Sequence, residues 1–524
     1  MKQTILFFTL LVSVCMNQPV WAQSKKKTVD PVARYDAYVQ QAVRDWQVPG
    51  LTVTVVKDGK VLLKKGYGVR EMGVTGSVDT QTLFAMASTT KAMTAACIGM
   101  LVDEGKLQWD DPVVNYLPDF LFYDPAVTRE VRVRDLLIHN TGVGNADVLW
   151  ASMQISSDEI LHRMRLIKPS YSLRSSFIYQ NIMYLAAGKV IEKVSGIPWD
   201  VFVRTRIFEP LGMRRTKALF KEVADEVNRA KPHIEINDTI RAVNSRIEEG
   251  LVDAVGPAGS IWTCPDDVAS WMICMLDSSR YTIGGTSKTL LKPATWAELF
   301  KPQTLVTDSQ FYPTQYLTKP VWKTYGLGWF QQDYRGQRVN FHTGSLTGMV
   351  AIHGQLPDQK VAVYVQGNLD HAELRHALMY RAFDEFGRPD ARLGVDRDWS
   401  TEFRQLYGAL KQRAKQAERK VDSTRVLNTK PSLPLTAYVG SYADPLYGKV
   451  VVTQKDGKLY ASINNLLTGY LEHWHFDTFR MVFDQFWNGK EPLSFILDMK
   501  GKVALVKGAG MELTKVPEDA QKGR

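Results

Sequence analysis

Cysteine is scarce in this sequence, with four residues in 524. Cys15 lies in an apolar leader, so the rest of the chain holds Cys97, Cys264 and Cys274, and an odd number does not favour a disulfide framework. Cys264 and Cys274 lie ten residues apart in a predicted helix. That spacing separates them by roughly 15 Å, too far for a disulfide. We therefore expect three small core residues rather than crosslinks.

Long apolar runs are also absent. The run from Ile5 to Val14 is about 10 residues long, whereas a membrane-spanning helix needs about 20. With Val20-Trp21-Ala22 as a small-x-small cleavage site, it predicts that residues 1–22 are a secretory signal peptide. The protein is then expected to be secreted or periplasmic in a bacterial envelope, without an integral membrane segment after cleavage. Lipidation at Cys15 is an open alternative, disfavoured by the bulky valine before it.

Positive charge is not concentrated, although the formal net charge is +10. The one basic run is Lys25–Lys27, and no nucleic-acid-binding motif is present, so no nucleic-acid partner is expected. His371 and His376 do not match H-E-x-x-H and are expected at the surface. His473 and His475 share a strand face without an evident third ligand. We therefore predict neither a metal nor another cofactor, and the oligomeric state stays open.

What the sequence does contain is an α+β order of elements. A predicted helix over 30–47 precedes two β-rich runs around Asp58-Gly59, a hairpin signal. Residues 131–215 look mainly helical, with breaks at 140–144 and 196–198, and strands return after Tyr325. This order predicts one antiparallel sheet assembled from both ends of a domain spanning 30–387, with a large helical insertion.

Two further regions follow that domain. The charged stretch 388–430 predicts a helical linker. Residues 431–516 contain short alternating runs joined by Asp-Gly and Lys-Gly turns, which predict a small all-β barrel or sandwich.

The stretch Ser88-Thr89-Thr90-Lys91 opens a helix of small and apolar residues. Residues three apart lie on one helical face, so Ser88 and Lys91 can touch. Burial favours neutral lysine, which can accept a proton from a serine hydroxyl and make it a nucleophile. The S-x-x-K pattern alone is weak, because Ser24 and Lys27 match it by chance. Ser88 differs from Ser24 in opening a predicted buried helix.

Two more stretches follow Ser88 in a set order. Tyr179-Gln180-Asn181 precedes an apolar helix, and His342-Thr343-Gly344 ends a strand-like run. The order S-x-x-K, Y-x-N, K/H-x-G resembles the serine β-lactamase and penicillin-binding-protein superfamily. The resemblance is closest to the class C β-lactamase, D-alanyl-D-alanine carboxypeptidase, D-aminopeptidase and family VIII esterase group, over about residues 33–386. The C-terminal region resembles a lipocalin-like domain.

The resemblance implies a role for each motif. Ser88 would be the nucleophile and Lys91 its base, with Tyr179 as a phenolate-like base or proton shuttle. Backbone N–H groups of Ser88 and Ser345 would form an oxyanion hole. Gly344 would let the substrate approach the backbone closely. The substrate-binding residues are expected to be Asn181, His342, Thr343, Gly344 and Ser345.

His342 stands where class C β-lactamases usually have lysine. Imidazole is mostly neutral at pH 7, so carboxylate binding should be weaker and strong β-lactamase activity is not expected. His139 matches a structural turn and is expected to pack rather than to act as an acid or base. The sequence thus predicts a secreted serine acyl hydrolase with an acyl-enzyme on Ser88, acting on a D-amino-acid peptide, a muropeptide or a small ester. The alternatives are a weak class C-type β-lactamase and a non-catalytic envelope penicillin-binding or sensor protein.

Overall fold

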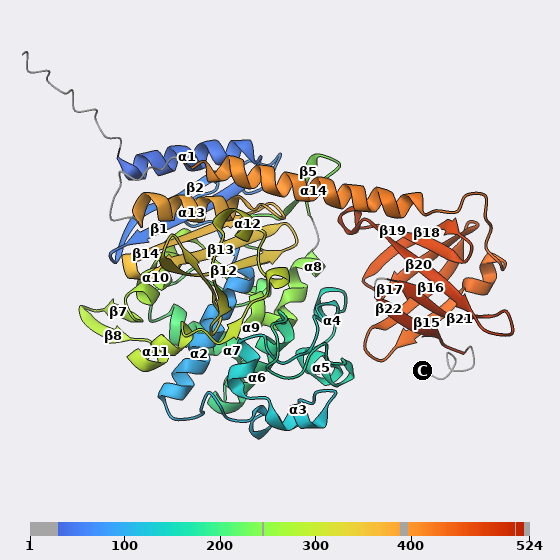
Figure 1. Cartoon of the computed structure of the whole chain (residues 1–524), viewed down its shortest axis with the longest axis horizontal. Helices are drawn as coiled ribbons and strands as arrows, with labels where there is room; N and C mark the ends of the chain where they lie inside the picture. The colour runs from blue at the N-terminus through green and yellow to red at the C-terminus, as the bar shows by residue number, and fades with distance from the viewer. Residues whose placement is uncertain (1–29, 244–245, 388–396, 509, 518–524) are drawn as a thin grey trace, which may run out of the picture.

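The computed structural model describes residues 30–243, 246–387, 397–508 and 510–517. The predicted signal peptide and the start of the predicted linker, residues 388–396, lie outside the described residues. In the described part of the chain, no helix is long and apolar enough to cross a membrane. Figure 1 shows a large mixed domain and a small barrel, joined by a long helix.

One antiparallel sheet of eight strands organises the large domain, in the order β2-β1-β14-β13-β12-β11-β10-β9. β1 and β14 come from opposite ends of the domain and pair from Leu51 with Gly367 to Lys57 with Val361. The predicted sheet assembled from both ends is therefore confirmed. The strands are β1 (Gly50–Lys57), β2 (Lys60–Gly68), β9 (Thr304–Leu305), β10 (Lys323–Tyr325), β11 (Phe330–Tyr334), β12 (Gln337–Leu346), β13 (Met349–Leu356) and β14 (Val361–Gly367).

Helices cover both faces of this sheet because both faces are apolar. One face packs against α1 (Pro31–Asp45) and α13 (Leu374–Phe386). The other packs against the helical insertion, which contains α2 (Lys91–Asp103), α6 (Asn181–Ser195) and α10 (Pro265–Leu276). Cys97, Cys264 and Cys274 are buried free thiols, as predicted. The α+β class with a helix-flanked sheet is confirmed.

Short elements complete the large domain. The helices are α3 (Pro125–Glu130), α4 (Val148–Ala151), α5 (Ser157–Arg163), α7 (Trp199–Val203), α8 (Arg246–Leu251), α9 (Gly256–Gly259), α11 (Pro293–Leu299) and α12 (Gln315–Thr318). Three two-stranded ribbons pair β3 (Phe84–Ala85) with β6 (Trp262–Thr263), β4 (His233–Ile236) with β5 (Thr239–Ala242), and β7 (Arg280–Ile283) with β8 (Thr286–Thr289).

The prediction of a mainly helical stretch over 131–215 was wrong in part. Only α6 is long, and two loops on either side of α4 and α5 pair with each other instead. The backbone N–H groups of Ser170 and Arg174 donate to the carbonyls of Gly142 and Asn140. These hydrogen bonds satisfy backbone N–H and carbonyl groups of the two loops, which in a helix would bond within the same segment.

The predicted charged linker contains α14 (Trp399–Ser423). Its first turn belongs to the core of the large domain, because Trp399 and Phe403 are fully buried there. The Trp399 indole N–H donates to Asp384 at 2.9 Å. The rest of α14 is mostly exposed and leads toward the barrel (Figure 1).

The C-terminal domain is a closed barrel of eight strands in sequential order, which confirms the predicted all-β barrel. β15 also pairs with β22, so the barrel has no open edge. Aromatic side chains fill its interior, including Tyr438, Tyr442, Phe479 and Phe495. The strands are β15 (Gly440–Asp444), β16 (Gly448–Lys455), β17 (Lys458–Ile463), β18 (Leu467–His475), β19 (Thr478–Phe483), β20 (Lys490–Leu497), β21 (Val503–Gly508) and β22 (Met511–Lys515).

Candidate active site

Ser88 lies in a single 3-10 turn, Ala87–Thr90, that leads directly into α2. Ala87, just before it, has a positive φ of 46°. That conformation is rare for a residue with a side chain, and such strain is often found at functional sites. β12 lies against this turn: a Cβ at Gly344 would come within 2.3 Å of the Met86 carbonyl oxygen. Gly344 therefore allows the strand to approach the Ser88 turn, rather than the substrate to approach the strand.

Lys91 is fully buried at the start of α2, as its apolar surroundings in the sequence predict. Its Nζ lies 3.2 Å from Ser88 Oγ, 2.7 Å from Asn181 Oδ1 and 2.8 Å from the Ala258 carbonyl oxygen. Burial lowers the pKa of Lys91 to about 7, and the Asp147 carboxylate acts in the opposite direction. Near neutral pH a substantial fraction of this amine is therefore unprotonated and able to accept a proton.

Tyr179 lies beside this pair, with its ring 4.9 Å from Lys91 Nζ. Its hydroxyl oxygen is buried and makes no hydrogen bond of standard geometry with any described residue, although the Ser88 hydroxyl lies close enough to affect its pKa. Burial raises the pKa of Tyr179 well above 10, while the Ser88 hydroxyl lowers it by less. The side chain is therefore a neutral phenol, which fits a proton shuttle and not a phenolate base. The His139 ring packs 4.4 Å from the Tyr179 ring, the packing role that the sequence predicts.

Asn181 connects Lys91 to a carboxylate that sequence reasoning missed. Its Nδ2 donates to both oxygens of Asp147 at 3.0 Å, while its Oδ1 accepts from Lys91. The Trp150 indole N–H also donates to Asp147, at 2.8 Å. No helical or strand spacing links position 147 to position 181, so only the folded chain brings Asp147 to Lys91.

The K/H-x-G stretch lies on β12, where side chains alternate between the two faces of the sheet. Thr343 and Ser345 line the same cleft as Ser88. His342 does not: it is 1% exposed, and its Nε2 accepts from the Tyr325 hydroxyl at 2.9 Å. Burial and the nearby Lys91 lower the pKa of His342 to about 3, so the ring is neutral. The expected contact between His342 and the substrate is thus not supported by its position.

Arg375, on α13, fixes the end of β12. Its Nη1 donates to the Gly344 carbonyl oxygen at 2.5 Å and to Ser345 Oγ at 2.9 Å. Glu373 pairs with this guanidinium and also with His376. The prediction that His376 is a surface residue was wrong, because α14 and the sheet cover α13 and leave the His376 side chain fully buried. His371 is exposed, as predicted.

The Ser88 cleft has a volume of about 790 Å³. The charged residues among those that line it are all acidic: Asp147, Glu249 and Asp370. Aromatic residues form much of the remaining wall: Trp150, Tyr179, Trp262, Phe311, Tyr312 and Phe330. Leu467 and Asn488, from the barrel, complete it. Within the described residues, no three His, Cys, Asp or Glu side chains are grouped to hold a metal ion.

Comparisons with known proteins show which families and folds this chain resembles. Residues 35–385 match the family described as Beta-lactamase, and residues 424–521 match a domain of unknown function, DUF3471. The second match names no function, so the resemblance of the barrel to lipocalin-like domains stays a prediction. The chain is 28% identical over 456 residues to the unguisins hydrolase ungD of Aspergillus violaceofuscus, covering 82% of this chain and 78% of that protein.

Two solved structures share the fold. The octameric penicillin-binding protein homologue from Pyrococcus abyssi aligns with a TM-score of 0.59 and 20% identity, over 92% of this chain and 100% of that chain. The D-amino acid amidase from Ochrobactrum anthropi aligns with a TM-score of 0.55 and 20% identity, over 67% of this chain and 96% of that chain. At these identities the likeness shows the fold alone.

Proposed function

The chain belongs to the β-lactamase family of serine hydrolases, and from this premise we propose that it cleaves an amide, peptide or ester bond through an acyl-enzyme on Ser88. Lys91 is the observation that carries the proposal. It is a buried amine, 3.2 Å from Ser88 Oγ, whose pKa of about 7 suits a general base at neutral pH.

In the proposed mechanism, Ser88 Oγ attacks the substrate carbonyl carbon while neutral Lys91 takes the hydroxyl proton. Tyr179 donates its phenolic proton to the leaving nitrogen or oxygen and takes up the proton that Lys91 removed from Ser88, so that both side chains are neutral again. The backbone N–H groups of Ser88 and Ser345 would stabilise the oxyanion. Water then attacks the acyl-enzyme carbonyl while neutral Lys91 takes a proton from it, and a proton is returned through Tyr179 to Ser88 Oγ as the acid leaves.

The charges of the cleft support a substrate without a carboxylate beside the scissile bond. Asp147 and Asp370 would repel a carboxylate, whereas Glu249 is already paired with Arg229, and His342 is buried and neutral. Arg375 is already occupied by Glu373 and by two acceptors on β12. A neutral ester or an amide therefore fits this cleft better than a β-lactam. The amide could be that of an amidated D-amino acid or an internal peptide bond next to a D-amino acid. The names of the amidase and hydrolase relatives agree with this choice.

A fluorophosphonate probe tests the proposal, because an activated serine oxygen attacks its phosphorus, fluoride leaves, and a stable phosphonate ester remains on that serine. We expect one adduct per chain, located on Ser88 by peptide mass spectrometry, and none in Ser88→Ala. Ser309→Ala is the matched control: Ser309 also lines the cleft and should leave labelling unchanged. Full labelling of Ser88→Ala would mean that another serine is the nucleophile, and no labelling of the wild-type protein would favour the non-catalytic alternative.

We also propose that the protein acts in the bacterial envelope, on the basis of the predicted signal peptide. Intact-mass analysis of the exported protein should find an N-terminus at Gln23. A full-length chain recovered from the cytoplasm would contradict this, and a lipid adduct at Cys15 would favour the lipoprotein alternative.

A further inference from the structure

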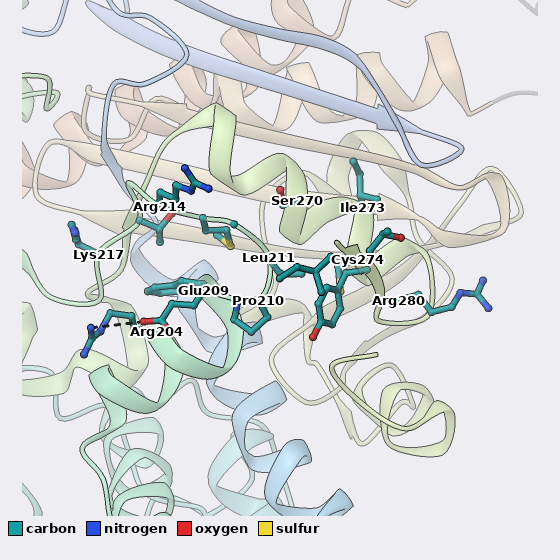
Figure 2. A pocket seen from close by; sticks show the side chains of 17 residues that line it. Arg204, Glu209, Pro210, Leu211, Arg214, Lys217, Ser270, Ile273, Cys274 and Arg280 are labelled. Carbon is teal, nitrogen blue, oxygen red and sulfur yellow. Dashed lines mark ion pairs between the residues drawn. The ribbon is translucent and has the colours of Figure 1, made fainter. Parts of the chain in front are cut away.

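A second cavity lies between the loop after α7 and the β7–β8 ribbon (Figure 2). Its volume is about 640 Å³, within the range of about 300–1,000 Å³ typical of small-molecule sites. It shares no lining residue with the Ser88 cleft. An occupant of this cavity would therefore be separate from the proposed substrate.

The floor of the cavity is apolar. Its lining residues from the loop after α7 and from α10 are mostly buried hydrophobic side chains: Phe208, Leu211, Met213, Ile273 and Cys274. Tyr281 and Ile283, on β7, form the facing wall. An alkyl chain placed here would be removed from water by these apolar side chains, which favours binding.

The rim of the cavity is cationic. Figure 2 shows Arg204, Arg214 and Lys217 on one side, with Arg280 on the other. Arg280 is paired with Asp277 at 2.6 Å, and Arg204 has a long contact of 3.9 Å with Glu209. Arg214 and Lys217 have no ion pair with any described residue, although Lys217 has a weak electrostatic interaction with Glu226, so both can contact an anionic ligand.

Arg204 and Phe208, which line the cavity at its rim and floor, belong to one π-helical turn, Arg204–Phe208, immediately after α7. The Glu209 N–H donates to the Arg204 carbonyl oxygen, which closes the wider turn. Such turns are rare and frequently occur at functional sites. The turn therefore marks this cavity independently of its charge and shape.

We propose that the cavity binds a single-chain amphiphile with an anionic head, specifically a long-chain carboxylate. The alkyl chain lies over the apolar floor, and the carboxylate meets Arg214 and Lys217. The acidic Ser88 cleft would repel the same molecule, which directs it to this second cavity. This ligand is additional to the proposed hydrolase function and does not depend on it.

Calorimetric titration of the full-length protein with dodecanoate, below its micelle concentration, tests this proposal. We expect one binding event per chain that weakens as salt is added. Dodecanol, which lacks the charge, should bind about tenfold more weakly, and acetate, which lacks the chain, should not bind. Dodecyl phosphate tests whether the site is instead specific for phosphate. If dodecyl phosphate binds and dodecanoate does not, the carboxylate assignment is wrong.

Three variants locate the site. Arg214→Glu/Lys217→Glu should weaken dodecanoate binding about tenfold or more without affecting dodecanol, whereas Arg214→Lys/Lys217→Arg should retain it. Ser270→Trp, which places a large side chain in the cavity from α10, should remove binding of both ligands. Thermal unfolding and fluorophosphonate labelling report whether each variant is folded. Unchanged dodecanoate binding in the charge-reversed and Ser270→Trp variants would contradict the proposal.

Discussion

Lys91 sets the pH at which the proposed reaction can proceed. The amine acts in its neutral form, and its pKa is about 7, so kcat/KM should rise as pH increases through about 7 and then level off. The pKa of Tyr179 lies well above 10, so loss of its proton should not reduce activity below that pH. A pH–rate profile on a neutral ester measures both limbs.

Asp147 allows the origin of that profile to be tested. Its carboxylate raises the pKa of Lys91, so Asp147→Asn should lower that pKa and move the rising limb to lower pH. Asp370→Asn is the matched control, because Asp370 also lines the cleft but does not contribute to the pKa of Lys91. A rising limb that stays in place in Asp147→Asn would show that another group titrates.

Ser88, Lys91 and Tyr179 should behave as one catalytic unit. Ser88→Ala should abolish turnover, and Lys91→Ala and Tyr179→Phe should each reduce kcat/KM by roughly 10²-fold to 10⁴-fold. The double variant Lys91→Ala/Tyr179→Phe should lose much less than the product of the two single losses. Circular dichroism should show that all four variants are folded. Strict multiplication of the single effects would mean that Lys91 and Tyr179 act independently.

At the scale of single residues, the sequence predicted contacts within one element better than contacts between elements. Helical spacing placed Ser88 beside Lys91, and burial of that helix predicted a lowered lysine pKa. The contact between Asp147 and Asn181 joins the residue before α4 to the first residue of α6, and no common periodicity links these positions. His342 could be assigned to the same strand face as Gly344 by alternation, but its hydrogen-bond partner Tyr325 lies on β10, on the far side of β11. That partner is not visible in a local pattern.

At the scale of elements, the approach of β12 to the Ser88 turn depends on Gly344. Gly344→Ala would place a Cβ 2.3 Å from the Met86 carbonyl oxygen and 2.9 Å from the Ser88 nitrogen, so the strand must move away. Because that strand carries Ser345, a proposed oxyanion donor, we expect a loss of kcat of roughly 10²-fold or more. Steady-state kinetics and thermal unfolding together measure the effect.

Gly408→Ala is the control for that substitution. Gly408 lies in α14, where an added Cβ would meet no atom within 4 Å. Alanine has the higher helix propensity, so this variant should be fully active and up to about 1 kcal/mol more stable. Equal activity of Gly344→Ala and Gly408→Ala would show that the close approach of β12 is not required.

Long, strongly patterned elements were the most predictable ones. The helices over 31–45 and 265–276 and the β1–β2 hairpin follow from periodicity and a turn signal. The loops within 131–215 could not be predicted in this way, because their backbone N–H and carbonyl groups bond to residues distant in the sequence. α14 was predicted as a linker from its charge, but Trp399 and Phe403 in its first turn belong to the core.

At the scale of the whole molecule, the barrel is expected to influence substrate choice. Leu467 and Asn488 line the Ser88 cleft, and the Asn488 side-chain nitrogen is buried without a partner among the described residues. A chain ending at residue 425 should stay folded and active on small esters but lose preference among longer peptides. Thermal unfolding and a peptide-length series measure the two effects. An unfolded product would mean that the barrel is part of the large domain's stability.

Asn488→Ala gives a milder test of the same contact, with the barrel left in place. We expect KM for longer substrates to rise while kcat for a small ester is unchanged, because Asn488 lies away from the reacting atoms. Lys500→Ala is the control, at an exposed turn between β20 and β21 that does not line the cleft. Identical kinetics in the two variants would argue against a substrate contact from the barrel.

The pairing of β1 with β14 has a consequence for how the chain is made. Leu51 pairs with Gly367, next to the edge strand β2, so the N-terminal hairpin joins the rest of the sheet only after more than half of the chain has been synthesised. Contacts between such distant segments raise the contact order, and closing so long a loop slows folding. The nascent chain therefore lacks its central sheet for much of translation. Such a delay would help a polypeptide that crosses a membrane unfolded, as export through the proposed signal peptide requires.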